Sequence, residues 1–235
     1  MTKHSAPGFF NKDASLVYDE RNRQLAPIAD CMHFLIRLVL REFPVRAHVL
    51  CVGVGTGAEI FSLSKAFPEW TFVGVDPSAP MLDVCRERLA AAGVSDRCEL
   101  IHGYVHDVPS GENFDVTLSI LVAHFVQRED RLGFYKAMCD RLRPNGYLIN
   151  TEISCDVTAE EFPSMLKNWE GVQAVMGATP ESLTNLARQL KEMLPIISPK
   201  ETENLLSQSG IHLPVRFFQA FMICGWYGKK ESSDA

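Results

Sequence analysis

The sequence predicts an α/β protein with a doubly wound parallel sheet, and three observations lead to this fold class. Short apolar runs such as His48–Val52 alternate with segments of helical periodicity, at lengths typical of strand–helix–strand units. The runs are apolar on both faces, as strands buried between two layers of helices are. A glycine-rich turn, Gly53-Val54-Gly55-Thr56-Gly57, joins the first run to a helical segment.

The composition indicates one globular domain over residues 1–235. Hydrophobic residues make up 46% and charged residues 22%, which excludes disordered and disulfide-scaffold proteins. The net charge of −6 provides no general basic field for a phosphate backbone, so direct nucleic-acid binding is disfavoured. The seven cysteines are scattered without a CxxC pair, and no apolar run is long enough to cross a membrane. We expect a cytoplasmic protein with reduced thiols.

The first half of the predicted fold begins with a helical segment over 9–43, whose apolar face is expected to hold Ile28, Cys31, Met32, Leu35 and Val39. A helix over 79–92 has Ser78 as its N-cap and ends at Gly93. The remaining elements are a helix over 58–67 and strands over 48–52, 71–75, 99–101 and 114–120.

The second half continues with a helix that ends at Pro144-Asn145-Gly146 and a strand over 147–153. One face of this helix is marked by Leu132, Tyr135, Met138, Cys139 and Leu142. Ser198-Pro199-Lys200-Glu201 begins a later helix that Gly210 ends. Two closing strands follow within 215–228, with a turn expected near Cys224-Gly225.

Residues 156–198 form a helical insertion between the fifth and sixth strands, because this stretch is too long for a plain connection. Thr158 and Glu161 have capping-box spacing, and Thr179-Pro180 marks a second helix start. We expect the insertion to form a lid over the carboxyl ends of the strands.

The glycine turn and Asp76 predict a ligand with an adenosine group. Glycine permits positive φ and lets a ligand lie against bare backbone at a helix N-terminus. Asp76 closes the next strand, where an acid can accept both hydroxyls of a ribose. Read as Gly53-x-Gly55-x-x-Ala58, the turn matches the dinucleotide fingerprint. Read as Gly53-x-Gly55-x-Gly57, it resembles the S-adenosylmethionine loop of class I methyltransferases, so two cofactors compete.

Motifs along the chain resemble those of the class I S-adenosylmethionine-dependent methyltransferases over about residues 45–228. They are Val49–Gly57, Val73–Ser78 followed by Met81, Phe114-Asp115-Val116 leading to Ser119 and His124, Leu142–Leu148, and Leu205–Ile211. The resemblance implies a Rossmann-like seven-stranded sheet with helices on both faces and an antiparallel last strand. It also implies S-adenosyl-L-methionine as the cofactor.

The same resemblance implies roles for individual residues. Gly53, Gly55 and Gly57 would face the methionine part of the cofactor, and Asp76 its ribose. The adenine would meet Pro77, Met81, Tyr104 and Val105, and the sulfonium would meet Ser119. This chain departs from the family at two of its positions, since Cys51 stands in place of a frequent acid and Tyr104 in place of a common aspartate.

Over its whole length the chain is similar to the carboxy-S-adenosylmethionine synthases, which use prephenate to build a carboxymethyl group on the cofactor. The likeness includes Phe10–Val17, Pro27 and Phe217–Phe221. It places Arg188 where that group has an arginine for the extra carboxylate. Ala29 and Ser119 depart from it, standing in place of a tyrosine and an asparagine.

His124, Tyr18 and Arg188 are the candidate catalytic residues. His124 follows the fourth strand and could serve as a general base or as a structural histidine. Tyr18 precedes the core and could fold over the cofactor, or could cap a helix. We expect no metal, because the His102-x-x-x-His106 pair lies after a strand, where the two imidazoles need not converge.

These observations favour a methyltransferase that acts on a small-molecule acceptor. Carboxy-S-adenosylmethionine synthesis is the alternative, and a non-catalytic cofactor-binding regulatory module is the second. The expected partner is a small-molecule substrate, and membrane contact is not expected. The sequence leaves the oligomeric state open, with a homodimer among the arrangements that it allows.

Overall fold

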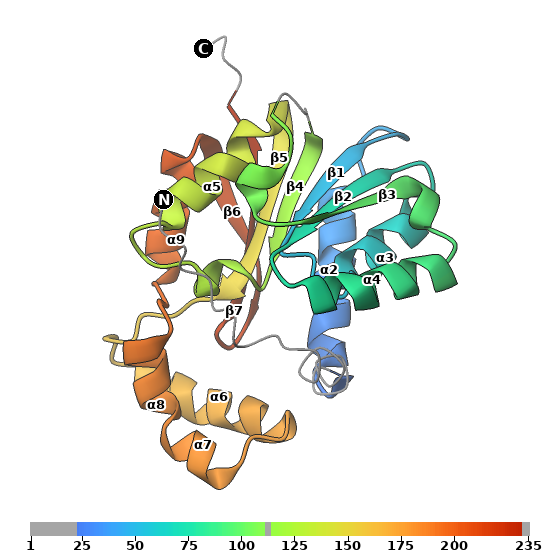
Figure 1. The fold of residues 1–235 in the computed structure, drawn as a ribbon. Coiled ribbons are helices and arrows are strands. Elements are labelled where there is room, and N and C mark those ends of the chain that lie inside the picture. Colours follow the sequence, from blue (N-terminus) through green and yellow to red (C-terminus); the bar gives the residue numbers. More distant parts are fainter. Residues whose placement is uncertain (1–22, 111–113, 232–235) are drawn as a thin grey trace.

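The computed structural model describes residues 23–110 and 114–231. Tyr18 and the stretch Phe10–Val17 lie outside the described residues. The described chain forms a seven-stranded sheet with helices on both faces (Figure 1). The strands are β1 (His48–Val52), β2 (Thr71–Asp76), β3 (Cys98–His102), β4 (Phe114–Ile120), β5 (Leu142–Ile153), β6 (Ile211–Ala220) and β7 (Ile223–Lys230). The main helices are α2 (Ala26–Val39), α3 (Ala58–Ala66), α4 (Ala79–Ala91), α5 (Arg131–Asp140) and α9 (Pro199–Gln208).

The strand order is β3-β2-β1-β4-β5-β7-β6. Strands β1 to β5 pair in parallel, whereas β7 runs antiparallel to both of its neighbours, β5 and β6. The predicted doubly wound sheet with an antiparallel last strand is therefore confirmed. Because β1 pairs with both β2 and β4, the order reverses there, and ligands of open α/β sheets bind beyond the strand ends at such a point.

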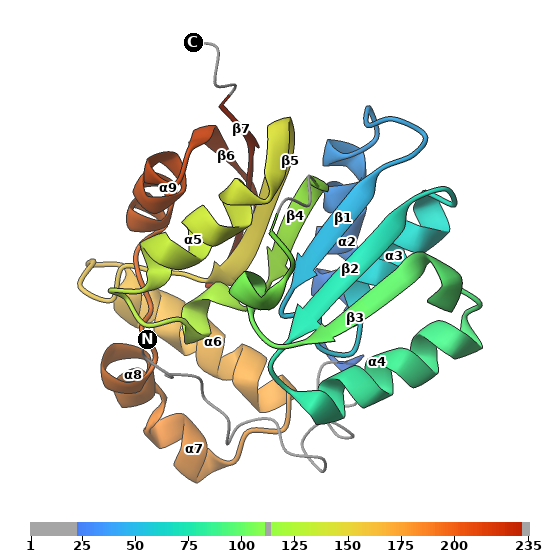
Figure 2. The ribbon, with the colours of Figure 1, turned by 45° about the horizontal axis from the view of Figure 1, so that its top comes forward.

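Helices cover both sides of the sheet (Figure 2), and a hydrophobic core lies on each face. Side chains of α2, α3 and α4 pack on one face, and those of α5 and α9 pack on the other. Burial on both sides explains why the central strands are apolar throughout. All seven cysteines lie in the described residues and are free; Cys31 is exposed, Cys98 is partly buried and the other five are buried.

The predicted helical insertion is present between β5 and α9. It contains α6 (Phe162–Val175), α7 (Pro180–Thr184), α8 (Leu186–Arg188) and a π-helical turn over Gln189–Met193. Figure 1 shows these helices beyond the carboxyl ends of the parallel strands. Phe162 and Trp169 are buried in the same core as α2 and α3, so Trp169 packs in the interior instead of lining an open surface.

Helix starts and stops follow the local chemistry of the sequence. The hydroxyl of Ser78 accepts a hydrogen bond from the backbone N–H of Met81, and Ser198 does the same for Glu201. Gly93 and Gly210 follow the ends of α4 and α9 with φ of 68° and 96°. The predicted caps and stops at these four residues are confirmed.

Two predicted turns are wrong. Pro144-Asn145-Gly146 does not end α5, which stops at Asp140; β5 already begins at Leu142 and pairs there with Phe114. The register shifts directly afterwards, and Asn145 has a φ of 64°, so the three residues form an irregularity inside a strand. The β6–β7 turn lies at 221–222, because Cys224 and Gly225 pair with β5.

Two further expectations about helices are corrected. Thr158 does not form a capping box with Glu161, since its backbone N–H and hydroxyl both donate to Asp156 Oδ1, and α6 begins only at Phe162. Cys31 is not on the buried face of α2. That face is centred on Met32 and Ile36. None of the helices in the described ranges is long and apolar enough to cross a membrane.

Candidate functional site

The glycine turn follows a left-handed path between β1 and α3. Gly53, Gly55 and Gly57 have φ of 69°, 52° and 87°, a conformation that residues with side chains rarely adopt. A Cβ at Gly53 would lie 2.4 Å from a methyl carbon of Val122, just after β4. A Cβ at Gly55 would meet nothing within 4 Å, so the backbone there faces open space.

Asp76 joins the end of β2 to the glycine turn. Its Oδ2 accepts a hydrogen bond from the Gly55 N–H at 2.9 Å, and its Oδ1 accepts one from the Ser78 N–H at 2.8 Å. Burial raises the pKa of Asp76, and the two N–H donors act in the opposite direction. An ionised carboxylate has about four acceptor positions, so two remain for a ligand.

The end of β3 completes this side of the site. The Gly103 N–H donates to the backbone carbonyl of Asp76 at 3.0 Å. Among the predicted adenine contacts, Met81 and Val105 are buried, whereas Tyr104 is 40% exposed. Met81 lies in the helix that follows β2, and Tyr104 and Val105 follow β3, so only Tyr104 of these three is exposed.

The two histidines of the candidate metal pair have separate contacts. His102 Nε2 lies 3.0 Å from the Pro77 carbonyl, to which it donates, and His106 stacks on Tyr104. Within 23–110 and 114–231, no group of three or more His, Cys, Asp or Glu side chains could hold a metal ion.

The exit of β4 is polar and strained. Ser119 lies between Val52 of β1 and Asn150 of β5, is fully buried, and its hydroxyl has no hydrogen-bond partner among the described residues. Leu121 has a φ of 58°, which costs about 1–2 kcal/mol for a residue with a side chain. Its N–H donates to the backbone carbonyl and to the hydroxyl of Thr151. Such strain tends to occur at functional sites.

His124 lies in a 3-10 turn over Ala123–Phe125 and is buried. Its Nδ1 accepts a long hydrogen bond, 3.4 Å, from the Ile153 N–H, so the neutral ring carries its proton on Nε2. Burial, together with the positive charge of Arg131, lowers the pKa of His124 to about 3. The imidazole is therefore neutral at physiological pH.

Arg188 is placed apart from these residues. It is exposed at the end of α8, and its guanidinium donates to Asn185 Oδ1 at 3.1 Å within the insertion. Ala29 lies in α2 and is partly buried. The structure thus brings together the glycine turn, Asp76 and the end of β3, but gives Arg188 no contact with them.

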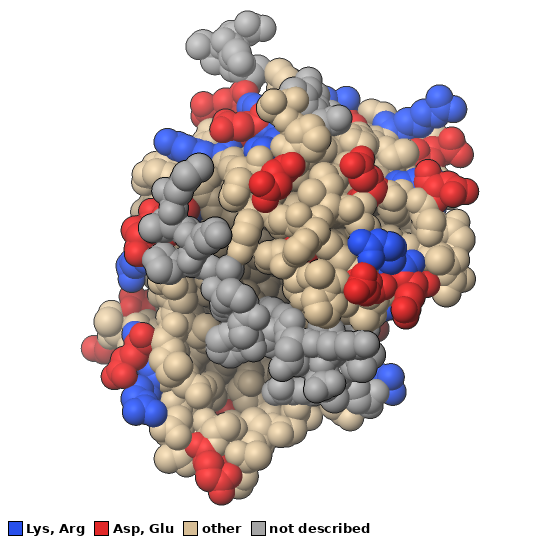
Figure 3. Space-filling model, viewed as in Figure 1, with Lys and Arg blue, Asp and Glu red and all other residues tan. Residues whose placement is uncertain are grey.

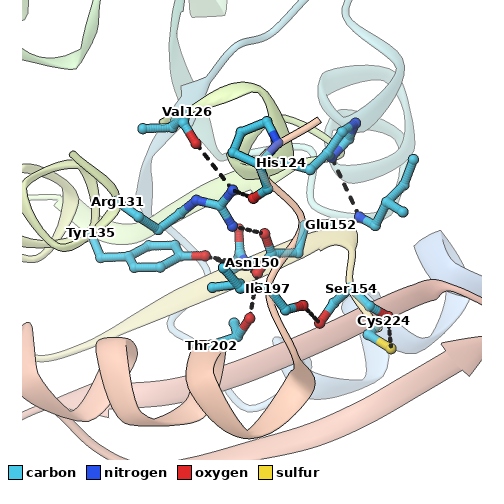
Figure 4. Close-up of polar contacts among 12 residues, drawn as sticks. His124, Val126, Arg131, Tyr135, Asn150, Glu152, Ser154, Ile197, Thr202 and Cys224 are labelled. Atoms are coloured by element: carbon cyan, nitrogen blue, oxygen red, sulfur yellow. Dashed lines mark hydrogen bonds and ion pairs between the residues drawn. The ribbon is translucent and has the colours of Figure 1, made fainter. Parts of the chain in front are cut away.

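Sequence reasoning missed a buried ionic cluster between β5, α5 and α9 (Figure 4). We use this name for the interacting side chains of Arg131, Tyr135, Asn150, Glu152 and Thr202. Arg131 and Glu152 form an ion pair at 2.6 Å with both side chains 0% exposed. A signal was present, because Asn150 and Glu152 interrupt a strand that should be apolar on both faces.

Glu59 is a second buried carboxyl that the sequence did not reveal. It lies in the first turn of α3, and burial raises its pKa to about 8. Burial is also the main reason why the pKa of Cys51 is raised, with Glu59 adding to the effect. Glu59 thus places an acid near Cys51, the position where the resemblance implies a frequent acid.

The family is recognised from the residues that build this site. The general model of a methyltransferase domain matches residues 49–146, which hold the glycine turn, Asp76 and β4. The carboxy-S-adenosyl-L-methionine synthase of Methylococcus capsulatus is 24% identical over 92% of this chain and 90% of its own length. Residues 49–146 therefore carry a methyltransferase domain, and the chain is similar to the class I S-adenosylmethionine-dependent methyltransferases.

Other methyltransferases share the fold or a part of the sequence. A structure assigned to an S-adenosyl-L-methionine-dependent methyltransferase from Methanococcus maripaludis covers all of this chain with a TM-score of 0.67 and 17% identity, over 99% of its own length. The erythromycin 3''-O-methyltransferase of Saccharopolyspora erythraea is 34% identical over 43% of this chain. The chain spans 32% of that enzyme and 58% of an O-methyltransferase structure from Nostoc punctiforme, whose TM-score is 0.64 at 17% identity.

The match of residues 49–146 to the methyltransferase domain decides between the two interpretations of the glycine turn. The methyltransferase pattern Gly53-x-Gly55-x-Gly57 applies, and the dinucleotide fingerprint does not. The cofactor of this methyltransferase is S-adenosyl-L-methionine.

Proposed function

We propose that this methyltransferase transfers the methyl group of S-adenosylmethionine to a small molecule held between the strand ends and the insertion. The observation that carries the proposal is the hydrogen bond between the Gly55 N–H and Asp76, because it joins a bare backbone turn to an acid at the switch point of the sheet. Bound cofactor would supply an electrophilic methyl group on a sulfonium. The protein must then bind the acceptor, orient it toward this methyl group and exclude water from the site.

The residues present fit the cofactor. Gly55 offers open backbone beside the start of α3, which suits a polar group of the methionine part. Asp76 keeps acceptor positions for the ribose hydroxyls. Pro77, Met81 and Val105, near the ends of β2 and β3, would border the adenine. Gly53 and Gly57 permit the path of the turn, and Ser119 would lie behind it.

His124 would act as a hydrogen-bond donor to the acceptor and not as its general base. Its Nδ1 already accepts the Ile153 N–H, so only Nε2–H is free to donate. A base with a pKa of about 3 takes up little proton at neutral pH. The acceptor would thus present a lone pair beside His124 and would lose any proton to water or to its own groups. Methyl transfer then depends mainly on alignment.

A small acceptor is supported by the insertion and by the surface charge. The insertion places α6, α7 and α8 beyond the strand ends, where a bulky polymer would meet them (Figure 1). Acidic and basic side chains are interspersed on the face that Figure 3 displays, without a broad basic patch. Related proteins named as O-methyltransferases agree with an acceptor of this size.

The test combines ligand identification with turnover. Small molecules released from the denatured protein should include S-adenosylmethionine or S-adenosylhomocysteine by mass spectrometry. Incubation with S-adenosylmethionine and a metabolite fraction should release S-adenosylhomocysteine, and the Asp76→Asn variant should release far less. Tight cofactor binding without turnover in any metabolite fraction would favour the regulatory binding module instead.

Carboxy-S-adenosylmethionine synthesis is the second candidate. It is favoured by the likeness to the synthase of Methylococcus capsulatus, which extends over nearly the full length of both chains. Against it stands the position of Arg188, which is exposed and bonded to Asn185. A carboxylate of the cofactor would need this guanidinium to turn toward the strand ends.

Arg188→Ala separates the two candidates. If the protein holds the carboxylated cofactor, the purified wild type should carry that heavier molecule and the variant should lose it. Truncating one partner of a buried charge pair costs about 2–5 kcal/mol, so the loss would be large. We expect the other result: the co-purifying ligand is the ordinary cofactor or S-adenosylhomocysteine, and Arg188→Ala retains it.

A further inference from the structure

Arg131 ties three separate segments together from the first turn of α5. Its guanidinium donates to Glu152 Oε2 on β5 at 2.6 Å, to the Val126 carbonyl after the His124 turn at 3.1 Å, and to the Pro195 carbonyl at 2.8 Å. Pro195 belongs to the return of the insertion toward α9. One buried side chain therefore connects the sheet, the His124 turn and the insertion (Figure 4).

Glu152 completes the pair from the other side. Its Oε1 accepts hydrogen bonds from the Tyr135 hydroxyl at 3.0 Å and the Thr202 hydroxyl at 2.8 Å, with the Asn150 amide at 3.4 Å. Burial raises the pKa of Glu152, while Arg131 and these donors act in the opposite direction. The carboxylate is thus held by α5 and α9 together.

The return segment, which we define as Pro195–Ile197, has a second anchor. The hydroxyl of Ser154, at the end of β5, donates to the Ile197 carbonyl at 2.8 Å, and this contact is also buried. The start of the insertion differs, because Asp156 and Thr158 are exposed and bond to each other. Buried hydrogen bonds therefore fix the return segment to the sheet, whereas the start of the insertion has only local hydrogen bonds and is held by the packing of Phe162 and Trp169 in the core.

A general gain in stability does not explain this arrangement. A buried ion pair contributes little over well-packed apolar side chains, because both charges must be desolvated. A planar guanidinium instead offers donors in fixed directions, which apolar residues and lysine cannot reproduce. Three acceptors on three segments make use of that geometry.

We propose that Arg131 and Glu152 are positioning residues that hold the return segment and the His124 turn in one fixed relation, so that the insertion moves at its entry side. This inference rests on the proposed role of the insertion as a cover over the methyl-transfer site. Small displacements of α6 and α7 that keep the core closed would admit the acceptor, and the His124 donor would stay aligned.

Arg131→Lys tests the proposal, since it keeps the charge and loses the fork of donors. Hydrogen exchange of the full chain with S-adenosylhomocysteine should become about tenfold faster or more at 186–197 and 121–126, the scale of losing a hydrogen bond to a charged group. Exchange in β1 and β2 and the calorimetric affinity for S-adenosylhomocysteine should not change. Arg86→Lys, in an exposed pair with Asp83 on α4, is the matched control and should leave exchange unaltered.

Ser154→Ala provides a milder second variant and should raise exchange at 194–198 alone. Wild-type exchange at the return segment in both folded variants would overturn the proposal, as would an equal rise over β1 and β2 in Arg131→Lys. If Arg131→Lys does not fold, Ser154→Ala and Glu152→Gln test the proposal by the same comparison of exchange at the return segment with exchange in β1 and β2. Failure of the wild type to bind S-adenosylhomocysteine would count against the proposed function, whereas the exchange pattern still tests the anchor.

Discussion

Asp76 has two tasks at the scale of a single residue. Its carboxylate fixes the Gly55 and Ser78 N–H groups and leaves acceptor positions for a ligand. The glycine turn and the ligand site therefore depend on the same side chain. A neutral amide in its place can accept through one oxygen only, so it would have to give up part of this arrangement.

Asp76→Ala should weaken the binding of S-adenosylhomocysteine by roughly 2 kcal/mol, the scale of lost hydrogen bonds to a charged acceptor. Isothermal titration calorimetry measures this, with Asp76→Asn expected to fall in between. Asp83→Asn, an exposed acid on α4, should bind like the wild type. Unchanged affinity in a folded Asp76→Ala protein would refute ribose recognition by this residue.

His124 should remain neutral across the whole range in which most histidines titrate. Its folded pKa of about 3 lies below the ordinary 6.5, so the unfolded chain takes up a proton first as the pH falls. The stability that this histidine contributes is present above pH 6.5 and is lost as the pH falls toward 3. Nitrogen NMR should find the Nε2–H tautomer with no titration between pH 8 and 5.

The variant His124→Asn keeps an acceptor for the Ile153 N–H and removes the titration. Between pH 7.5 and pH 5, its free energy of unfolding, measured in urea, should fall less than that of the wild type. A His124 signal that titrates near pH 6.5 would show that the ring is not desolvated as described.

At the scale of elements, the sequence predicted what neighbouring residues determine. Buried apolar runs located the first four strands closely, and Ser78 and Ser198 located helix starts, because a cap depends on residues three positions away. Pro144-Asn145-Gly146 led to a wrong prediction of a helix end, since a proline and a glycine also occur at irregularities inside strands. The predicted position of the β6–β7 turn is a few residues too far along the chain, because pairing with β5 sets where this turn lies.

The candidate site divides in the same way. The glycine turn and Asp76 carry their own signal in residue type and spacing, so they could be found from the sequence. Arg131 and Glu152 are brought together only by packing of α5 on β5, and no local pattern pairs them. The low pKa of His124 likewise depends on burial, which a sequence does not display.

Ligand should change hydrogen exchange in one part of the insertion and leave it unchanged in another. S-adenosylhomocysteine should slow hydrogen exchange in α6 and α7, because a cover orders over an occupied site. The return segment should exchange slowly with and without ligand, since we expect the hydrogen bonds from Arg131 and Ser154 to persist when ligand binds. Peptides from β7 serve as the reference. Equal exchange in α6 and α7 under both conditions would contradict a ligand-ordered cover.

At the scale of the whole molecule, the insertion and the sheet share one interior. Phe162 and Trp169 pack in the same core as residues of α2, α3 and β1. We infer that residues 156–198 are a part of a single domain and not an appended module. Movement of the insertion is then confined to small displacements that keep this core closed, because protein interiors are tightly packed.

Burial makes six of the seven cysteines weakly reactive toward thiol reagents in the folded protein. Burial raises the pKa of six of the seven thiols, to about 12 for Cys85 and Cys224, so little reactive thiolate exists at neutral pH. Cys31 alone is exposed, on α2. Native protein should take up one maleimide label per chain by mass spectrometry, and Cys31→Ser should take up none in the same time; a second rapid adduct would contradict this. A dye or surface tether can thus be attached at one known point without engineering.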